Sequence, residues 1–156
     1  GPRVPGPVRG DPPASAGGGV RAVILIACVD DRGGMLFNRR RQSQDRLLRQ
    51  DLLEEAGGRP VWLGPDSLQQ FPDPPENLRC AEEFFHRAGE GELCFFEDAD
   101  PAPWLERAEG VILYHWNRRY PADLYFPLPL AGWTLVRREE FPGSSHERIT
   151  KEVYTR

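Results

Sequence analysis

The stretch WLERAEGVILYHW at residues 104–116, followed directly by NRRYPADLYFP at 117–127, decides the fold. It combines a helical segment, an apolar strand over 110–116, and a turn in which an acidic residue and an aromatic residue precede Phe-Pro. A second apolar run, VILIACV at 23–29, is typical of a strand that is buried on both faces of a sheet. Strands of this kind, alternating with helices, predict an α/β protein with a mostly parallel central sheet.

Further elements extend this alternation along the chain. Strands are predicted over 59–63, 78–80 and 92–96, and helices over 45–56, 65–71, 81–88 and 101–110. GWTLVRREEF at 132–141 and ERITKEVYTR at 147–156 predict two strands of a C-terminal antiparallel hairpin. Residues 1–20 consist mainly of Pro, Gly and small residues, which predicts a disordered leader ahead of one domain over 21–156.

Composition excludes several classes of function. The net charge is −4, from 20 basic and 24 acidic residues, which argues against a nucleic-acid partner. Three cysteines without a CxxC pair indicate reduced thiols and a cytoplasmic location. No apolar run approaches the length of about 20 residues that a membrane span needs, so we expect no membrane association. The three histidines share no ligand spacing, so we expect no metal site.

The order of these elements resembles the dihydrofolate reductase family over nearly all of residues 22–156. VILIACVDDRGGMLFN resembles the first strand and mobile loop of that family, PVWLGPDSLQQF its apolar-Met-Gly-Arg-x-Thr segment, and YPADLYFP its acidic-aromatic-Phe-Pro signature. The resemblance implies the dihydrofolate-reductase-like three-layer α/β fold, with the C-terminal antiparallel hairpin. It also implies hydride transfer from NADPH to dihydrofolate or a related pterin.

Four residues stand where the family keeps functional groups. Asp45 occupies the place of the pterin-binding carboxylate and Tyr114 the place of a Thr in the same network, so both are candidate catalytic residues. Gly64 and Ser67 match cofactor-binding positions. The alternatives stay open: Asp45 could simply cap its helix, and Tyr114 could simply pack in the core.

The departures from the family argue against the cofactor. Pro65 stands where the family has an Arg that binds the 2′-phosphate of NADPH, and Phe96-Glu97 replaces a Gly-Gly pair that approaches the pyrophosphate. The segment from Glu76 to Glu109 holds ten acidic residues and three arginines, a local charge of −7 that repels phosphates. We therefore expect no NADPH to bind unless the chain is a working reductase.

An arginine-rich loop is the other unusual feature. Asn38, Arg39, Arg40 and Arg41 belong to NRRRQSQDR at 38–46, and a guanidinium is suited to binding carboxylate or phosphate. These four residues, with Asp30 and Trp116, are candidate ligand-binding residues. We expect Asp45 and Tyr114 to face one cleft, with at least one of the three arginines at its mouth. Otherwise the loop lies in solvent and Trp116 only covers the core.

Two classes of function remain. The first is a diverged dihydrofolate-reductase-like protein that binds a small heteroaromatic or anionic ligand, or a partner. The second is an NADPH-dependent reductase of dihydrofolate or a related pterin. The sequence leaves the oligomeric state open.

Overall fold

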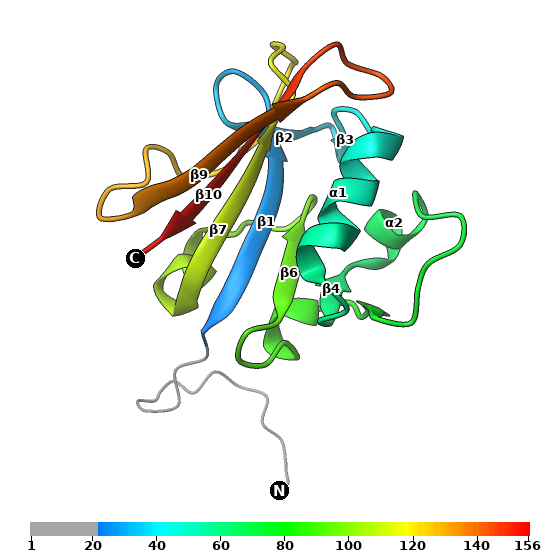
Figure 1. Ribbon diagram of the computed structural model, residues 1–156, viewed down its shortest axis with the longest axis vertical. Coiled ribbons are helices and arrows are strands. Elements are labelled where there is room, and N and C mark those ends of the chain that lie inside the picture. The colour runs from blue at the N-terminus through cyan, green and yellow to red at the C-terminus, as the bar shows by residue number, and fades with distance from the viewer. Residues whose placement is uncertain (1–21) are drawn as a thin grey trace, which may run out of the picture.

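The computed structural model describes residues 22–156, so the predicted leader at 1–20 lies outside the described residues. A seven-stranded sheet runs through the centre in the order β5-β4-β6-β1-β7-β10-β9 (Figure 1). Its strands are β1 (Val23–Val29), β4 (Val61–Leu63), β5 (Leu78–Cys80), β6 (Leu93–Phe96), β7 (Ala108–His115), β9 (Thr134–Phe141) and β10 (Ile149–Thr155). The first five strands of that order pair in parallel, and β10 and β9 add the antiparallel C-terminal hairpin. The predicted α/β class and the mostly parallel sheet are confirmed.

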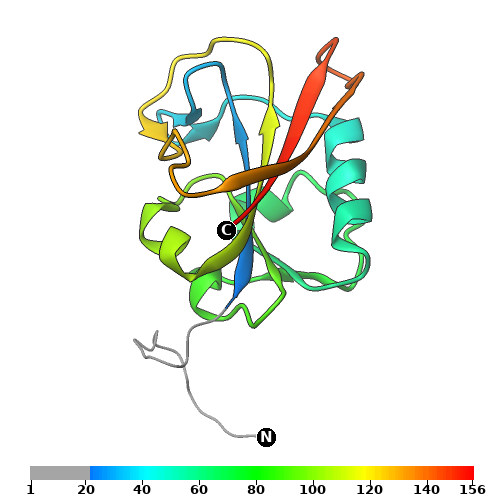
Figure 2. The same cartoon turned by 60° about the vertical axis from the view of Figure 1, so that its left-hand side comes forward.

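Side chains alternate between the two faces of β1, as the pleat of a strand requires. Leu25 and Ala27 belong to the hydrophobic cluster on one face, and Ile26 and Cys28 to the cluster on the other. Because both faces are covered, the run at 23–29 is apolar throughout. Layers therefore lie on both sides of the central sheet (Figure 2).

The two layers differ in their structure. Helix α1 (Arg46–Ala56) packs Leu48 and Leu52 on one face. On the other face lie the 3₁₀ turns η1 (Phe84–His86) and η2 (Ala102–Arg107) and a small sheet. This small sheet consists of β2 (Gly34–Phe37), β3 (Arg40–Arg41) and β8 (Leu124–Tyr125), in the order β3-β2-β8. A short helix, α2 (Pro65–Leu68), follows β4.

Two of the predicted helices are wrong, and three strands were not predicted. The segments 81–88 and 101–110 form only the 3₁₀ turns η1 and η2. A segment this short gains little from helix propagation, and packing of Phe85 on Trp104, with ring centroids 4.9 Å apart, decides the local structure instead. Strands β2, β3 and β8 have two to four residues each, too few to give an alternating pattern.

Four of the parallel strands lead into loops that matter here, all at one end of the sheet. Asp30 follows β1, Gly64 follows β4, Glu97 follows β6 and Trp116 follows β7. In open α/β sheets, ligands bind beyond the carboxyl ends of the strands, so these loops are where a site is expected. Within residues 22–156 no helix is long and apolar enough to cross a membrane.

Candidate functional site

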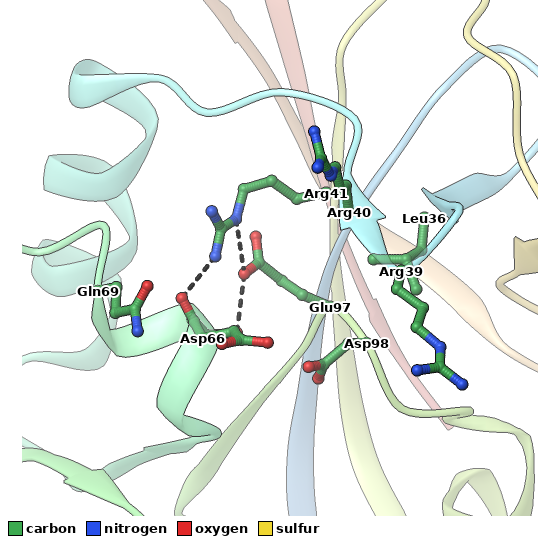
Figure 3. Close-up of a pocket in the computed structure, with 9 residues that line it drawn as sticks. Leu36, Arg39, Arg40, Arg41, Asp66, Gln69, Glu97 and Asp98 are labelled. Atoms are coloured by element: carbon green, nitrogen blue, oxygen red, sulfur yellow. Dashed lines mark hydrogen bonds and ion pairs between the residues drawn. The ribbon is translucent and has the colours of Figure 1, made fainter.

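A cavity of about 290 Å³ lies at the carboxyl ends of β4 and β6 (Figure 3). Helix α2 contributes Asp66 and Ser67 to it, and the loop after β6 contributes Glu97 and Asp98. The other wall is formed by the turn between β2 and β3, which contributes Arg39, and by β3, which contributes Arg40 and Arg41. Four predicted site residues, the three arginines and Ser67, therefore line one cavity.

Glu97 forms the floor of this cavity. Its side chain is only 8% exposed, and its Oε1 accepts hydrogen bonds from Arg41 Nε (3.2 Å), Ser67 Oγ (2.8 Å) and Gln70 Nε2 (2.9 Å). The carboxylate is therefore fixed in place from three directions, and Arg41 offsets its charge.

The arginine turn owes its position to its backbone. Asn38 and Arg39 both have positive φ, 53° and 65°, so the chain reverses sharply between β2 and β3. The Asn38 N–H donates to Asp123 Oδ2 at 3.0 Å, which fixes the turn. Arg41 then reaches across the cavity, where its Nη2 also donates to the Asp66 carbonyl at 2.6 Å.

Charges of opposite sign face the cavity without being paired inside the protein. Within residues 22–156, the guanidinium groups of Arg39 and Arg40 and the carboxylates of Asp66 and Asp98 form no ion pair. Figure 3 places Glu97 and Asp98 between Asp66 on one side and Arg39 on the other. Three arginines and three carboxylates line the cavity, so its formal net charge is zero. The site is therefore polar and carries charges of both signs.

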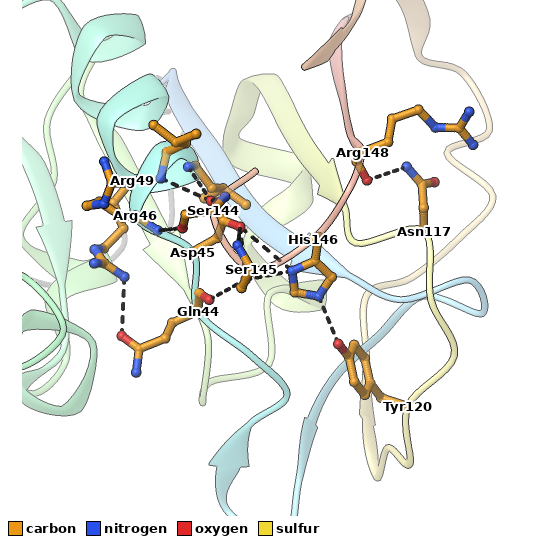
Figure 4. Close-up of polar contacts among 12 residues, drawn as sticks. Gln44, Asp45, Arg46, Arg49, Asn117, Tyr120, Ser144, Ser145, His146 and Arg148 are labelled. Atoms are coloured by element: carbon orange, nitrogen blue, oxygen red, sulfur yellow. Dashed lines mark hydrogen bonds and ion pairs between the residues drawn. The ribbon is translucent and has the colours of Figure 1, made fainter. Parts of the chain in front are cut away.

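The predicted position of Asp45 at the start of a helix is correct, but its predicted orientation toward a cleft is wrong. Asp45 is the N-cap of α1, and its Oδ1 accepts the N–H groups of Leu47 (3.0 Å) and Leu48 (3.1 Å). The loop between β9 and β10 adds three donors: the Ser144 N–H to Oδ1, and the N–H and hydroxyl of Ser145 to Oδ2 (Figure 4). The side chain is fully buried.

These hydrogen bonds decide how Asp45 titrates. Burial by itself raises the pKa of the Asp45 carboxyl, but the donors from Ser144, Ser145 and Leu48 outweigh it and hold the pKa well below its ordinary value. Asp45 is therefore ionised at neutral pH and joins the C-terminal hairpin to the start of α1.

His146 extends this network as a neutral imidazole. Burial lowers its pKa, and the nearby Arg118 lowers it further, against the opposing effect of Asp45. The Ser145 hydroxyl has one proton and lies near Asp45 Oδ2 and the Gln44 carbonyl, both acceptors. The 2.7 Å contact between Ser145 Oγ and His146 Nδ1 therefore requires Nδ1–H to donate, and His146 Nε2 accepts from the Tyr120 hydroxyl at 2.8 Å.

Tyr114 belongs to a different cluster, so the expectation that it shares a cleft with Asp45 is wrong. Its hydroxyl donates to Asp51 Oδ2 at 2.6 Å, and Lys151 Nζ lies 2.8 Å from the same oxygen and 2.5 Å from Glu55 Oε1. Burial, followed by the charge of Asp51, raises the pKa of Tyr114 far above its usual value. Lys151 is 3% exposed and ties α1 to β10 through both carboxylates.

The remaining candidates do not line this cavity. Asp30 holds the turn after β1, because its carboxylate accepts from the N–H groups of Arg32 and Gly34, both at 2.8 Å. Burial raises the pKa of Asp30, but these and further hydrogen bonds lower it overall. Trp116 is 3% exposed and stacks on His146 with ring centroids 4.5 Å apart. Gly64 is the N-cap of α2.

Glu97 and Asp98 were not predicted to be binding residues. Their charge indicated only that they repel phosphate, although acidic residues directly after a buried strand could have indicated a site. No group of His, Cys, Asp and Glu side chains in the described part of the chain could hold a metal ion.

Comparison with known proteins supports the fold. A dihydrofolate reductase from Enterococcus faecalis, solved in complex with NADP(H) and RAB-propyl, superimposes with a TM-score of 0.60 at 12% identity. The match covers 86% of this chain and 96% of that chain. The chain therefore has a dihydrofolate-reductase-like fold. No protein-family model and no curated protein matches the sequence.

Proposed function

We propose that this chain is a diverged dihydrofolate-reductase-like protein that binds a small heteroaromatic or anionic ligand in the cavity between Arg39–Arg41 and Glu97, and does not use NADPH. The observation that carries the proposal is the position of Glu97. Its buried carboxylate occupies the end of β6, where the resemblance places the pyrophosphate of the cofactor. A carboxylate and a phosphate repel each other there, most strongly where water is excluded.

Two further features support the loss of the cofactor. Pro65 begins α2, and it has neither a charged side chain nor a backbone N–H to offer to a phosphate. Asp66 and Asp98 add carboxylates to the same cavity. The three arginines supply the attraction for an anionic group, and guanidinium groups bind carboxylate or phosphate oxygens through paired hydrogen bonds.

An NADPH-dependent reductase of dihydrofolate or a related pterin is the second candidate. The fold supports it, since the similar enzyme from Enterococcus faecalis was solved with NADP(H). Ser67, at a cofactor-binding position by resemblance, also still lines the cavity. The hydroxyl of Ser67, however, is already donated to Glu97.

A thermal-shift screen with NADPH, NADP, folates, nucleotides and small polyanions tests the proposal. A ligand at 100 times its Kd stabilises the folded state by about 2.7 kcal/mol, which gives a clear rise in Tm. We expect an anionic or heteroaromatic compound to raise the Tm of the wild type and of Glu82→Gln, a variant of an exposed residue outside the cavity, but not of Arg40→Gln. Stabilisation by NADPH, together with its oxidation when dihydrofolate is added, would establish the reductase instead.

A further inference from the structure

We infer that the cavity is built for a small zwitterion, whose cationic group binds Glu97 and Asp98 and whose anionic group binds Arg39 and Arg40. The inference rests on the proposed function, because it takes this cavity to be the ligand site. It goes further by assigning a charge of the ligand to each wall.

One carboxylate oxygen of Glu97 accepts no hydrogen bond from the described residues. Oε1 accepts three hydrogen bonds, whereas Oε2 accepts none from any residue within 22–156. Among the described residues the buried side-chain acceptor without a partner is Gln42 Oε1, so Glu97 Oε2 is open to solvent at the cavity. A donor group of a ligand can therefore reach Oε2 and form a charge-assisted hydrogen bond with it. Glu97 lines the cavity, so the donor comes from inside it.

The carboxylate of Asp98 lies beside Glu97 in the chain. Asp98 follows Glu97 directly, lines the same cavity and pairs with no cation of the described chain. Arg41 offsets one negative charge at Glu97, which leaves Asp98 uncompensated. An ammonium group has three donors and a compact charge, so it can bridge two adjacent carboxylates.

The opposite wall of the cavity carries positive charge. Arg39 and Arg40 are exposed at the turn, and their guanidinium groups have no carboxylate partner among the described residues. A ligand with only an anionic group binds the arginines but is repelled by Glu97 and Asp98. A ligand with only a cationic group binds the two carboxylates but is repelled by the arginines. Repulsion of each singly charged ligand by one wall gives the selectivity for a zwitterion.

The cavity is small. A volume of about 290 Å³ lies just below the range for small-molecule sites, roughly 300–1,000 Å³. One compact molecule fits in it. The two charged walls of so small a cavity are within reach of the two ends of a short chain.

Three compounds of equal carbon number separate the contributions of the two charges: 6-aminohexanoate carries both, hexanoate only the anion and hexylamine only the cation. Binding is measured by NMR titration at low salt, following the backbone amides of Glu97, Asp98 and Arg39. We expect 6-aminohexanoate to bind at least about tenfold more tightly than either analogue, since it gains a second charge-assisted hydrogen bond.

Variants assign each charge to its wall. Glu97→Gln and, independently, the exposed Asp98→Asn should each weaken 6-aminohexanoate and hexylamine by about 10- to 100-fold and leave hexanoate no weaker. Arg40→Gln should weaken 6-aminohexanoate and hexanoate but not hexylamine. The matched control Glu82→Gln should change none of the three. Since Asp98 is exposed, Asp98→Asn tests the inference even if Glu97→Gln fails to fold.

Two results overturn the inference. One is binding of either singly charged compound as tightly as 6-aminohexanoate; the other is unshifted amides at about 10 mM 6-aminohexanoate, well above a millimolar Kd. If a compound from the thermal-shift screen shifts the same amides while 6-aminohexanoate does not, the cavity remains a ligand site and only the zwitterion is rejected. If no compound shifts them, the proposed function fails as well.

Discussion

Replacing Asp45 by Asn distinguishes a simple helix cap from an anchor of the C-terminal hairpin. Asn is as good an N-cap as Asp, so a residue that only capped α1 would lose only the effect of its charge at the helix N-terminus, at most about 1 kcal/mol. In this structure Asp45 also accepts three hydrogen bonds from the loop between β9 and β10. The anchor role therefore predicts a larger loss.

The magnitude follows from the two carboxylate oxygens. The carbonyl oxygen of Asn can take the place of Oδ1, which accepts three N–H groups. Its NH₂ group then faces the Ser145 N–H, which donates to Oδ2 at 2.7 Å. A buried N–H left without an acceptor costs about 1–3 kcal/mol, and the lost negative charge at a helix N-terminus adds about 0.3–1 kcal/mol. We expect Asp45→Asn to lower the free energy of unfolding by about 2–3 kcal/mol.

Urea denaturation at pH 7 measures this loss, with Asp73→Asn as the control. Asp73 is an exposed loop residue, so its variant should stay within about 0.5 kcal/mol of the wild type. A loss below about 1 kcal/mol for Asp45→Asn would reduce the residue to a helix cap and refute the anchor role.

The pH dependence gives a second measure of the same interaction. The pKa of Asp45 is lower in the folded protein than in the unfolded chain, where it is near 3.9. Its stabilising contribution is therefore complete above about pH 5 and falls as the pH drops toward the folded pKa. Between pH 5 and pH 3 the wild type should lose more stability than Asp45→Asn, so the two curves should converge in acid; parallel curves would contradict the assignment.

Two further predictions concern contacts of α1 and of the hairpin. Lys151→Met leaves Asp51 and Glu55 without their shared buried cation and should cost about 2–3 kcal/mol in urea denaturation, less than a fully buried pair because both carboxylates are partly exposed. A cost below 1 kcal/mol, as is typical of a surface pair, would contradict the buried role of Lys151. Gly143→Ala places a Cβ against Asp45 Oδ2 and should lower the Tm, with a loss of at least about 1 kcal/mol, whereas an unchanged Tm would show that the loop can move aside.

The sequence predicted the central sheet well because burial on both faces leaves a direct trace in it. The runs at 23–29 and 110–116 are apolar throughout, and the structure places them side by side as β1 and β7. The cap at Asp45 was one of the two roles that the local sequence left open for this residue. The helices expected at 81–88 and 101–110 were wrong, since aromatic packing between these two distant segments replaces helix formation.

The environment of each candidate residue could not be predicted, because it depends on partners far away in the chain. Asp45 meets Ser144 and Ser145 about 100 residues later, and Glu97 meets Arg41 from 56 residues earlier. A local pattern contains no information about such pairs. The cavity consequently combines arginines that were predicted to bind a ligand with a carboxylate that was expected only to repel one.

The central proposal is that this dihydrofolate-reductase-like fold carries a ligand site that excludes NADPH. Measuring the affinity for NADPH tests it most directly. NADPH fluorescence is titrated with the protein at low ionic strength, where the repulsion between phosphates and the carboxylates of Glu97, Asp98 and Asp66 is screened least. We predict that NADPH shows no saturable binding with a Kd lower than about 1 mM. Saturable binding with a low-micromolar Kd would contradict the account.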